Sequence, residues 1–135
     1  MDEDESGETH LTVQGQLSPN AARFNQSTQF GISDTTLRPR TTASVAWAPP
    51  PWVIQDAAGP NERTPNIAPI IQEIVNQPAW ISGNPLAVII TGTGERVAHA
   101  YDSDPNKAPL LYIEYNTGTP VNSANARNKS CKRGF

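Results

Sequence analysis

The stretch TTASVAWAPPPW, residues 41–52, carries the plainest structural signal in the sequence. Its first seven residues are rich in β-branched and aromatic side chains, which favour strands. Proline cannot donate a ladder hydrogen bond and biases the residue before it toward extended geometry. The stretch therefore predicts a strand over residues 41–47 that ends rigidly at the prolines, with Trp52 just beyond them.

Other segments on both sides of this stretch also have strand patterns. Residues 9–17, THLTVQGQL, alternate apolar and polar side chains, which indicates a half-buried strand. Residues 84–90, NPLAVII, and 108–115, APLLYIEY, are nearly continuous apolar runs, typical of strands covered on both faces. A weaker strand is predicted over residues 96–101, RVAHAY, after the glycine-rich turn TGTGE.

One segment, NIAPIIQEIVNQPAW at residues 66–80, changes to a helical period. Its apolar residues recur at i, i+3, i+4, i+7 and i+8, which places one apolar stripe on a short helix. Pro69 fits the first helical turn and Pro78 marks the end, while Gln72 and Glu73 are expected to face water. The residues of the stripe are Ile67, Ile70, Ile71, Ile74 and Val75.

The composition suits a single loop-rich, all-β domain. The chain has 135 residues, 36% of them hydrophobic, and 13 prolines, which argues against a helical bundle. Without a fixed repeat or a regular alternation of strands and helices, residues 1–115 are predicted to form an antiparallel β-sandwich, jelly-roll-like, with one short helix. Residues 116–135 lose all periodicity and are predicted to be a disordered tail or linker.

Charge and cysteine content exclude several classes of protein. The net charge is −3, the chain starts with the acidic run DEDESGE, and its charged residues after Glu114 are all cations. Four cations without interleaved aromatic residues do not predict nucleic-acid binding. The single cysteine, Cys131, rules out an internal disulfide. No apolar run reaches the roughly 18 residues of a membrane span, and no secretory signal pattern stands at the start.

No catalytic apparatus can be recognised, so we expect a protein that is not an enzyme. The turn TGTGER lacks the spacing of a phosphate loop and precedes a strand, so hairpin glycines are the better interpretation. His10 and His99 lie on separate predicted strands, without further ligands at the spacing of a metal site. No nucleophile elbow of the G-x-S-x-G kind is present.

Acidic residues are the candidate ligands of a structural calcium ion, because hard cations bind several carboxylate oxygens supplied by loops. Calcium is the one cofactor considered. The candidate ligands are Asp2 and Asp4 in the acidic start, and Asp102 and Asp104 in the segment YDSDPN. The twelve-residue spacing of a calcium-binding hand is absent. A solvated turn is therefore the alternative interpretation.

Aromatic residues are the best lead to a ligand. Sugar rings pack their C–H faces on flat aromatic rings, while their hydroxyl groups reach charged or amide side chains. Such a site could be built at the ends of the predicted elements from Trp52, Tyr101, Arg96, Asp102 and Asn106. The alternative is that the tryptophans are core residues.

The ligand predicted from these residues is a polysaccharide. Polyuronates are the first class to consider, because Arg38, Arg40 and Arg96 could pair with carboxylates in a bidentate manner. Ordinary surface charges are the other interpretation of these arginines.

The order of these features resembles the bacterial DNRLRE-type β-sandwich modules, relatives of the alginate-type carbohydrate-binding modules. The likeness covers residues 2–115 and is carried by SVAWAPPPW and by RTPNIAPIIQEIVNQPAWISGNPLAVIITGTGERVAHAYDSDPNKAPLLYIEY. The family's W-x-x-x-P pattern, strand-to-helix step and last two strands match Trp47 with Pro51, residues 66–75, residues 86–90, and Pro109, Leu111, Ile113 and Tyr115.

This resemblance implies a noncatalytic carbohydrate-binding or adhesive module of a secreted or surface bacterial protein, beside other domains of a larger parent. A structural spacer domain with no ligand of its own is the alternative. Family members begin with further strands before an acidic DExxSG-like turn, whereas this chain begins at MDEDESG. The likeness thus implies a sandwich incomplete at its N-terminus, whose open strand edges favour pairing with another chain.

Overall fold

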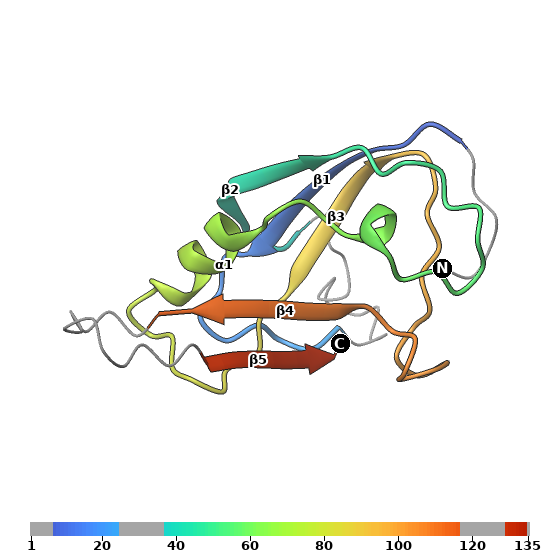
Figure 1. The fold of residues 1–135 in the computed structure, drawn as a ribbon. Helices are drawn as coiled ribbons and strands as arrows, with labels where there is room; N and C mark the ends of the chain where they lie inside the picture. The colour runs from blue at the N-terminus through green and yellow to red at the C-terminus, as the bar shows by residue number, and fades with distance from the viewer. Residues whose placement is uncertain (1–6, 25–36, 117–128, 135) are drawn as a thin grey trace, which may run out of the picture.

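The computed structural model describes residues 7–24, 37–116 and 129–134 of the chain. Its elements, in order, are β1 (His10–Gln16), β2 (Arg40–Trp47), the 3₁₀ helix η1 (Pro60–Glu62), α1 (Ala68–Val75), β3 (Val88–Thr93), β4 (Leu110–Tyr115) and β5 (Lys129–Gly134). These regular elements are mostly strands, with one short α-helix (Figure 1). The predicted β-rich fold class is confirmed at this level, as is the single predicted α-helix.

Three of the strands form an antiparallel sheet in the order β2-β1-β3. In its central part Val13 of β1 lies opposite both Val45 and Ile90. Residues directly opposite one another in an antiparallel sheet point to the same face. This register therefore gathers apolar side chains on one face, and α1 packs against that face through β1 and β2.

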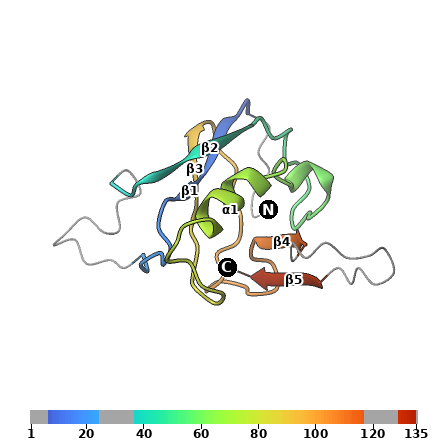
Figure 2. The same cartoon turned by 90° about the vertical axis from the view of Figure 1, so that its left-hand side faces the viewer.

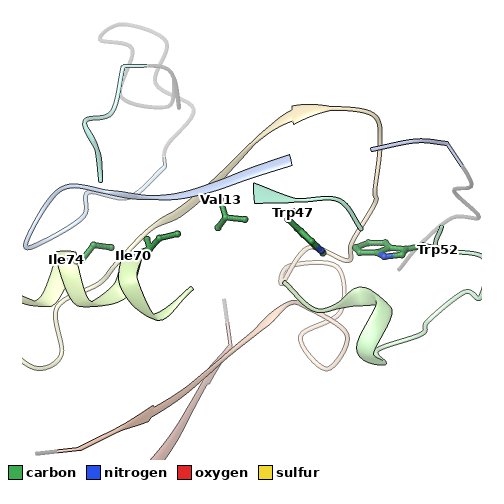
Figure 3. Close-up of a cluster of buried hydrophobic side chains, with 5 residues drawn as sticks. All are labelled: Val13, Trp47, Trp52, Ile70 and Ile74. Carbon is green, nitrogen blue, oxygen red and sulfur yellow. The ribbon is translucent and has the colours of Figure 1, made fainter. Parts of the chain in front are cut away.

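The core lies between α1 and this sheet (Figure 3). Val13, Ile70 and Ile74 have no exposed surface, because the two isoleucines of the helical stripe point directly at β1 and β2. A Cβ added at Gly15 would lie 2.6 Å from Cδ1 of Ile74 and 2.9 Å from Cγ2 of Ile70. Glycine at this position is what allows α1 to approach the sheet so closely.

Glu73 of α1 does not simply face water, as its place in the sequence predicted. Its carboxylate accepts hydrogen bonds from the backbone N–H of Thr42 at 2.8 Å and of Ala43 at 2.7 Å. Both donors lie where the β1–β2 register shifts, between the pairs of Gln14 and Gln16, so the sheet leaves them without a ladder partner. The N–H of Ala43, followed by that of Thr42, lowers the pKa of Glu73 by stabilising the charged carboxylate.

A second, two-stranded sheet is formed by β4 and β5, which pair antiparallel from Leu110 opposite Gly134 to Tyr115 opposite Lys129. Figures 1 and 2 show α1 between this pair and the three-stranded sheet. The strand β5 occupies part of the segment for which the sequence predicted a tail, because the edge of β4 offers backbone groups for pairing. The rest of that segment, residues 117–128 and 135, lies outside the described residues.

Two predicted boundaries in the second half of the chain are wrong. β3 starts at Val88 and continues through Gly92 to Thr93, because β1 pairs with it along this whole length, so TGTGE is not the predicted turn. Residues 96–101, a predicted strand, have no regular structure. None of the helices in the described parts of the chain is long and apolar enough to cross a membrane.

Candidate functional site

The candidate site lies on the connection between β3 and β4. The carbonyl of Ala100 accepts hydrogen bonds from the N–H of Ser103 at 3.0 Å and of Asp104 at 3.1 Å. The carbonyl of Asp104 in turn accepts from Lys107 and Ala108, both at 3.1 Å. Residues 100–108 thus form two consecutive turns, called the double turn below.

Asp56 anchors the double turn to the segment that follows Trp52. Its Oδ1 lies 2.9 Å from Nε2 of His99, and its Oδ2 accepts a hydrogen bond from Nζ of Lys107 at 2.9 Å. The His99 side chain is only 11% exposed, but that of Asp56 is 43% exposed, so the contact lies at the surface of the molecule. Asp56 adopts a φ of 60°, a left-handed conformation that aspartate tolerates better than most residues.

The same contacts set the charge state of Asp56. The hydrogen bond from Lys107 is the largest influence on its pKa, followed by the one from His99, and both lower it. Each contact favours the carboxylate over the neutral acid because both partners donate to the charged form. Asp56 therefore joins the double turn to the rest of the molecule as an ionised hub.

Arg96 has a structural role that the sequence did not indicate. Its guanidinium donates to the carbonyl oxygens of Gly7 at 2.8 Å, Pro49 at 3.2 Å, Pro50 at 3.3 Å and Glu95 at 2.6 Å. These bonds join the start of the β3–β4 connection to the proline run and to the segment before β1. The prediction that Arg96 contacts a ligand is therefore not supported, because its donors already bind the backbone.

Arg38 is likewise engaged within the protein. It is only 6% exposed, and it donates to the carbonyl oxygens of Ala22 at 2.9 Å and Arg23 at 3.1 Å and to Oε1 of Gln16. Its guanidinium also lies 3.8 Å from the centre of the Phe24 ring. Two of the three arginines considered for a polyuronate thus have their donors directed at the protein itself.

Trp52 belongs to the core and not to a ligand platform. Its side chain is 6% exposed and packs at a tilt on Trp47, with ring centres 6.3 Å apart (Figure 3). The indole N–H donates to the carbonyl of Asn61 at 3.2 Å, so the polar atom is satisfied in the interior. The ligand role predicted for Trp52 is corrected by this burial, and the alternative core interpretation holds.

The other predicted site residues do come together. Tyr101, Asp102 and Asn106 are all exposed and all lie on the double turn. Tyr101 keeps 53% of its surface exposed, which leaves a flat ring open to a ligand. The contact that orients this turn was missed by the sequence analysis, because Asp56 lies 43 and 51 residues away from its partners His99 and Lys107.

Two of the four predicted calcium ligands, Asp102 and Asp104, lie within the described residues. Asp104 is half-buried, and its Oδ1 accepts a hydrogen bond from the N–H of Asn106 at 3.0 Å. Across residues 7–24 and 37–116, no three or more His, Cys, Asp and Glu side chains are grouped as metal ligands. Asp2 and Asp4 lie outside the described residues, so the calcium ion stays a prediction.

A cleft of about 2380 Å³ runs between β4 and the layer formed by α1 and the three-stranded sheet. Asp56, His99 and Lys107 line a polar part of it. Its apolar lining includes Ile67, Ile71, Val75, Ile90, Leu111 and Ile113. The molecule therefore has both an exposed aromatic ring on a loop and a large, partly apolar cleft.

Comparison of the chain with protein-family models, with curated proteins and with solved structures gives no match. The family resemblance described above thus stays a prediction.

Proposed function

We propose that this protein is a noncatalytic carbohydrate-binding or adhesive module of a secreted or surface protein, and that the double turn holds the ligand. In this proposal β4–β5 and the three-stranded sheet belong to a sandwich-like fold in which α1 occupies part of the space between the two sheets. The observation that carries the proposal is the exposed ring of Tyr101, 53% open, on a turn that is anchored through Asp56.

The chemistry of the double turn fits a sugar. The face of a phenol ring packs against the C–H groups of a pyranose, and the carboxylate of Asp102 and the amide of Asn106 can bind hydroxyl groups. Because Asp56 already holds the turn, little conformational entropy remains to be lost on binding. A turn that is already ordered can bind a ligand through few contacts without a large loss of entropy.

The contacts of Arg38, Arg96 and Lys107 favour a neutral polysaccharide over a polyuronate. The guanidinium groups of Arg38 and Arg96 bind the protein, and the ammonium of Lys107 pairs with Asp56. A neutral glycan needs ring packing and hydroxyl hydrogen bonds, and it needs no cation. The proposal therefore departs from the polyuronate that the arginines predicted.

The experiment is affinity gel electrophoresis in soluble neutral polysaccharides and in a polyuronate, followed by a glycan array. Tyr112→Ala is the matched control for Tyr101→Ala, because both tyrosines are 53% exposed. We expect a neutral glycan to retard the wild type and Tyr112→Ala, and Tyr101→Ala to lose the retardation with an unchanged circular dichroism spectrum.

Two results would contradict this proposal. If Tyr101→Ala binds like the wild type, the ligand is not held on the double turn. If no glycan retards the wild type or binds on the array, the spacer interpretation replaces the binding module.

A further inference from the structure

Among the described residues, no strand pairs with the outer edge of β3. β3 is an edge strand, and the N–H of Gln16 donates to the carbonyl of Ala87 at 2.9 Å, one step beyond the β1–β3 pairs. In an antiparallel ladder, hydrogen-bonded pairs alternate with non-bonded ones. By this alternation from the Gln16–Ala87 bond, the backbone groups of Ile89, Thr91 and Thr93 bond to β1. The N–H and C=O groups of the alternate residues, Val88, Ile90 and Gly92, point away from it.

Figure 1 shows β3 at the margin of the three-stranded sheet, with β4 crossing below it. An edge of this kind is a template for another extended backbone, whose carbonyl and N–H groups have the same spacing. The six residues of β3 span about 20 Å at ~3.3 Å per residue, which sets the length of such a partner.

The side chains beside this edge are apolar. Ile90 lies opposite Val13, on the face that α1 covers, yet it remains 47% exposed, and none of the described strands lies beyond it. Ile71 and Val75 of α1 and Ile113 of β4 are half-buried and line the same cleft. A strand added to β3 would place every second side chain among them.

The size of the cleft leaves room for a polymer. Its volume of about 2380 Å³ exceeds the roughly 300–1,000 Å³ of ordinary small-molecule sites. A polysaccharide would leave the backbone edge of β3 without a matching ladder and would set hydroxyl groups against isoleucine and valine. A polypeptide satisfies both the edge and the apolar lining.

We propose that the β3 edge and the apolar part of the cleft bind an extended segment of a partner polypeptide. The segment adds to the sheet beside β3 and turns an apolar side chain into the cleft at every second position. Asn106 and Lys107 of the double turn line the same cleft, but Tyr101 and Asp102 do not. The proposal rests on the β3 edge and does not depend on carbohydrate binding.

The first test uses a fluorescein-labelled peptide, Thr-Val-Thr-Val-Thr-Val-Thr-Lys, in a fluorescence anisotropy titration with the full chain. We expect saturable binding. A second peptide of the same sequence, N-methylated at alternate residues, loses one row of donors and should bind at least tenfold more weakly. A third peptide of the same composition, with the valines consecutive, should also bind at least tenfold more weakly, because its apolar side chains no longer share one face.

The second test changes the protein. Ile90→Pro removes an outward N–H and leaves the bonds to β1 in place, since proline is tolerated at such edge positions. Ile90→Lys places a charge beside the apolar part of the cleft. It tests the proposal if Ile90→Pro does not fold. We expect at least a tenfold loss of affinity in both, and less than a twofold change for the control Ile81→Lys, at an isoleucine that is 66% exposed.

Three results would overturn the proposal: no saturable binding, equal binding of the N-methylated peptide, or unaltered affinity of Ile90→Lys. A dimer that Ile90→Lys dissociates, without any peptide binding, would also overturn it and would assign the edge to a second copy of the chain. Tyr101→Ala should leave peptide affinity unchanged, so this result is read separately from the glycan experiment.

Discussion

The layer of α1 and the three-stranded sheet encloses a core, whereas β4 in the second sheet leaves most of its side chains exposed. Val13, Ile70 and Ile74 are fully buried in the first layer, while Tyr112 and Leu110 of β4 are 53% and 56% exposed. A helix laid across a sheet buries apolar surface on both partners, but a two-stranded sheet alone is marginally stable in water. We infer that stability is concentrated in the first layer and that binding surface is concentrated around the second.

Polar contacts take the place of a packed core in positioning the second layer. Arg96 binds the carbonyls of Pro49 and Pro50, and Asp56 binds His99 and Lys107. All of these bonds hold the connection that leads from β3 into β4. Hydrogen bonds of this kind are directional, so they can define the width of a cleft that apolar packing leaves unfilled.

The largest expected effect comes from removing a core ring. Trp52→Ala should lower the free energy of unfolding by about 3–5 kcal/mol, because it leaves a cavity beside Trp47 and leaves the carbonyl of Asn61 without its donor. Urea denaturation measures this loss. Tyr112→Ala, on the exposed part of β4, is the control and should cost about 0.5 kcal/mol or less. Equal losses in the two variants would place Trp52 outside the core.

A pair of isoleucine truncations compares the two layers directly. Ile74→Ala should cost about 2–5 kcal/mol, since the side chain is fully buried between α1 and the sheet. Ile113→Ala, at a half-buried position of β4, should cost about 1 kcal/mol. Similar losses at both positions, measured by the same urea titration, would show that the second layer is as tightly packed as the first.

The smallest expected effect is a dependence of stability on pH. The folded-state pKa of Glu73 lies below its usual value of 4.5, and that of Asp56 lies below 3.8. In each case the unfolded chain binds more protons between the two values, so stability rises with pH across that window. The contribution is fully present above the usual pKa and is lost as the pH falls through the lowered one.

Urea midpoints measured from about pH 6 down to about pH 2 test this dependence. Glu73→Gln and Asp56→Asn should each flatten the acid slope, because the variant side chain has no proton to bind. Gln72→Ala, a neutral change beside Glu73, should keep the wild-type slope. If the acid slope persists in both variants, neither Glu73 nor Asp56 makes the stability depend on pH.

Local patterns predicted much of the first layer and less of the second. β1, β2 and α1 start and end within a few residues of their predicted bounds, because alternation, the proline run and the isoleucine stripe act over short stretches of chain. The end of β3 depended on its register with β1, and residues 96–101 became irregular where Arg96 binds distant carbonyls. β5 exists through pairing with β4, which no periodicity in its own residues indicates.

The candidate site shows the same division. Tyr101, Asp102 and Asn106 were predicted together because they follow one another closely in YDSDPN. The alternatives left open for Trp52 and Arg96 depended on neighbours far along the chain, and those neighbours placed one in the core and the other against the backbone. Asp56 was not predicted as a site residue, since nothing in its local sequence indicates its contacts with His99 and Lys107.

The amino-acid sequence by itself determined which segments could be strands, where the prolines end one of them and which helical stripe is apolar. Those properties follow from backbone geometry and from side-chain period within about ten residues. Only the tertiary structure decided that Trp52 is buried, that Asp56 ties together residues 43 and 51 positions away, and that the β3 edge lies open beside an apolar cleft. Such features depend on contacts between distant segments, and these form only when the whole chain has packed.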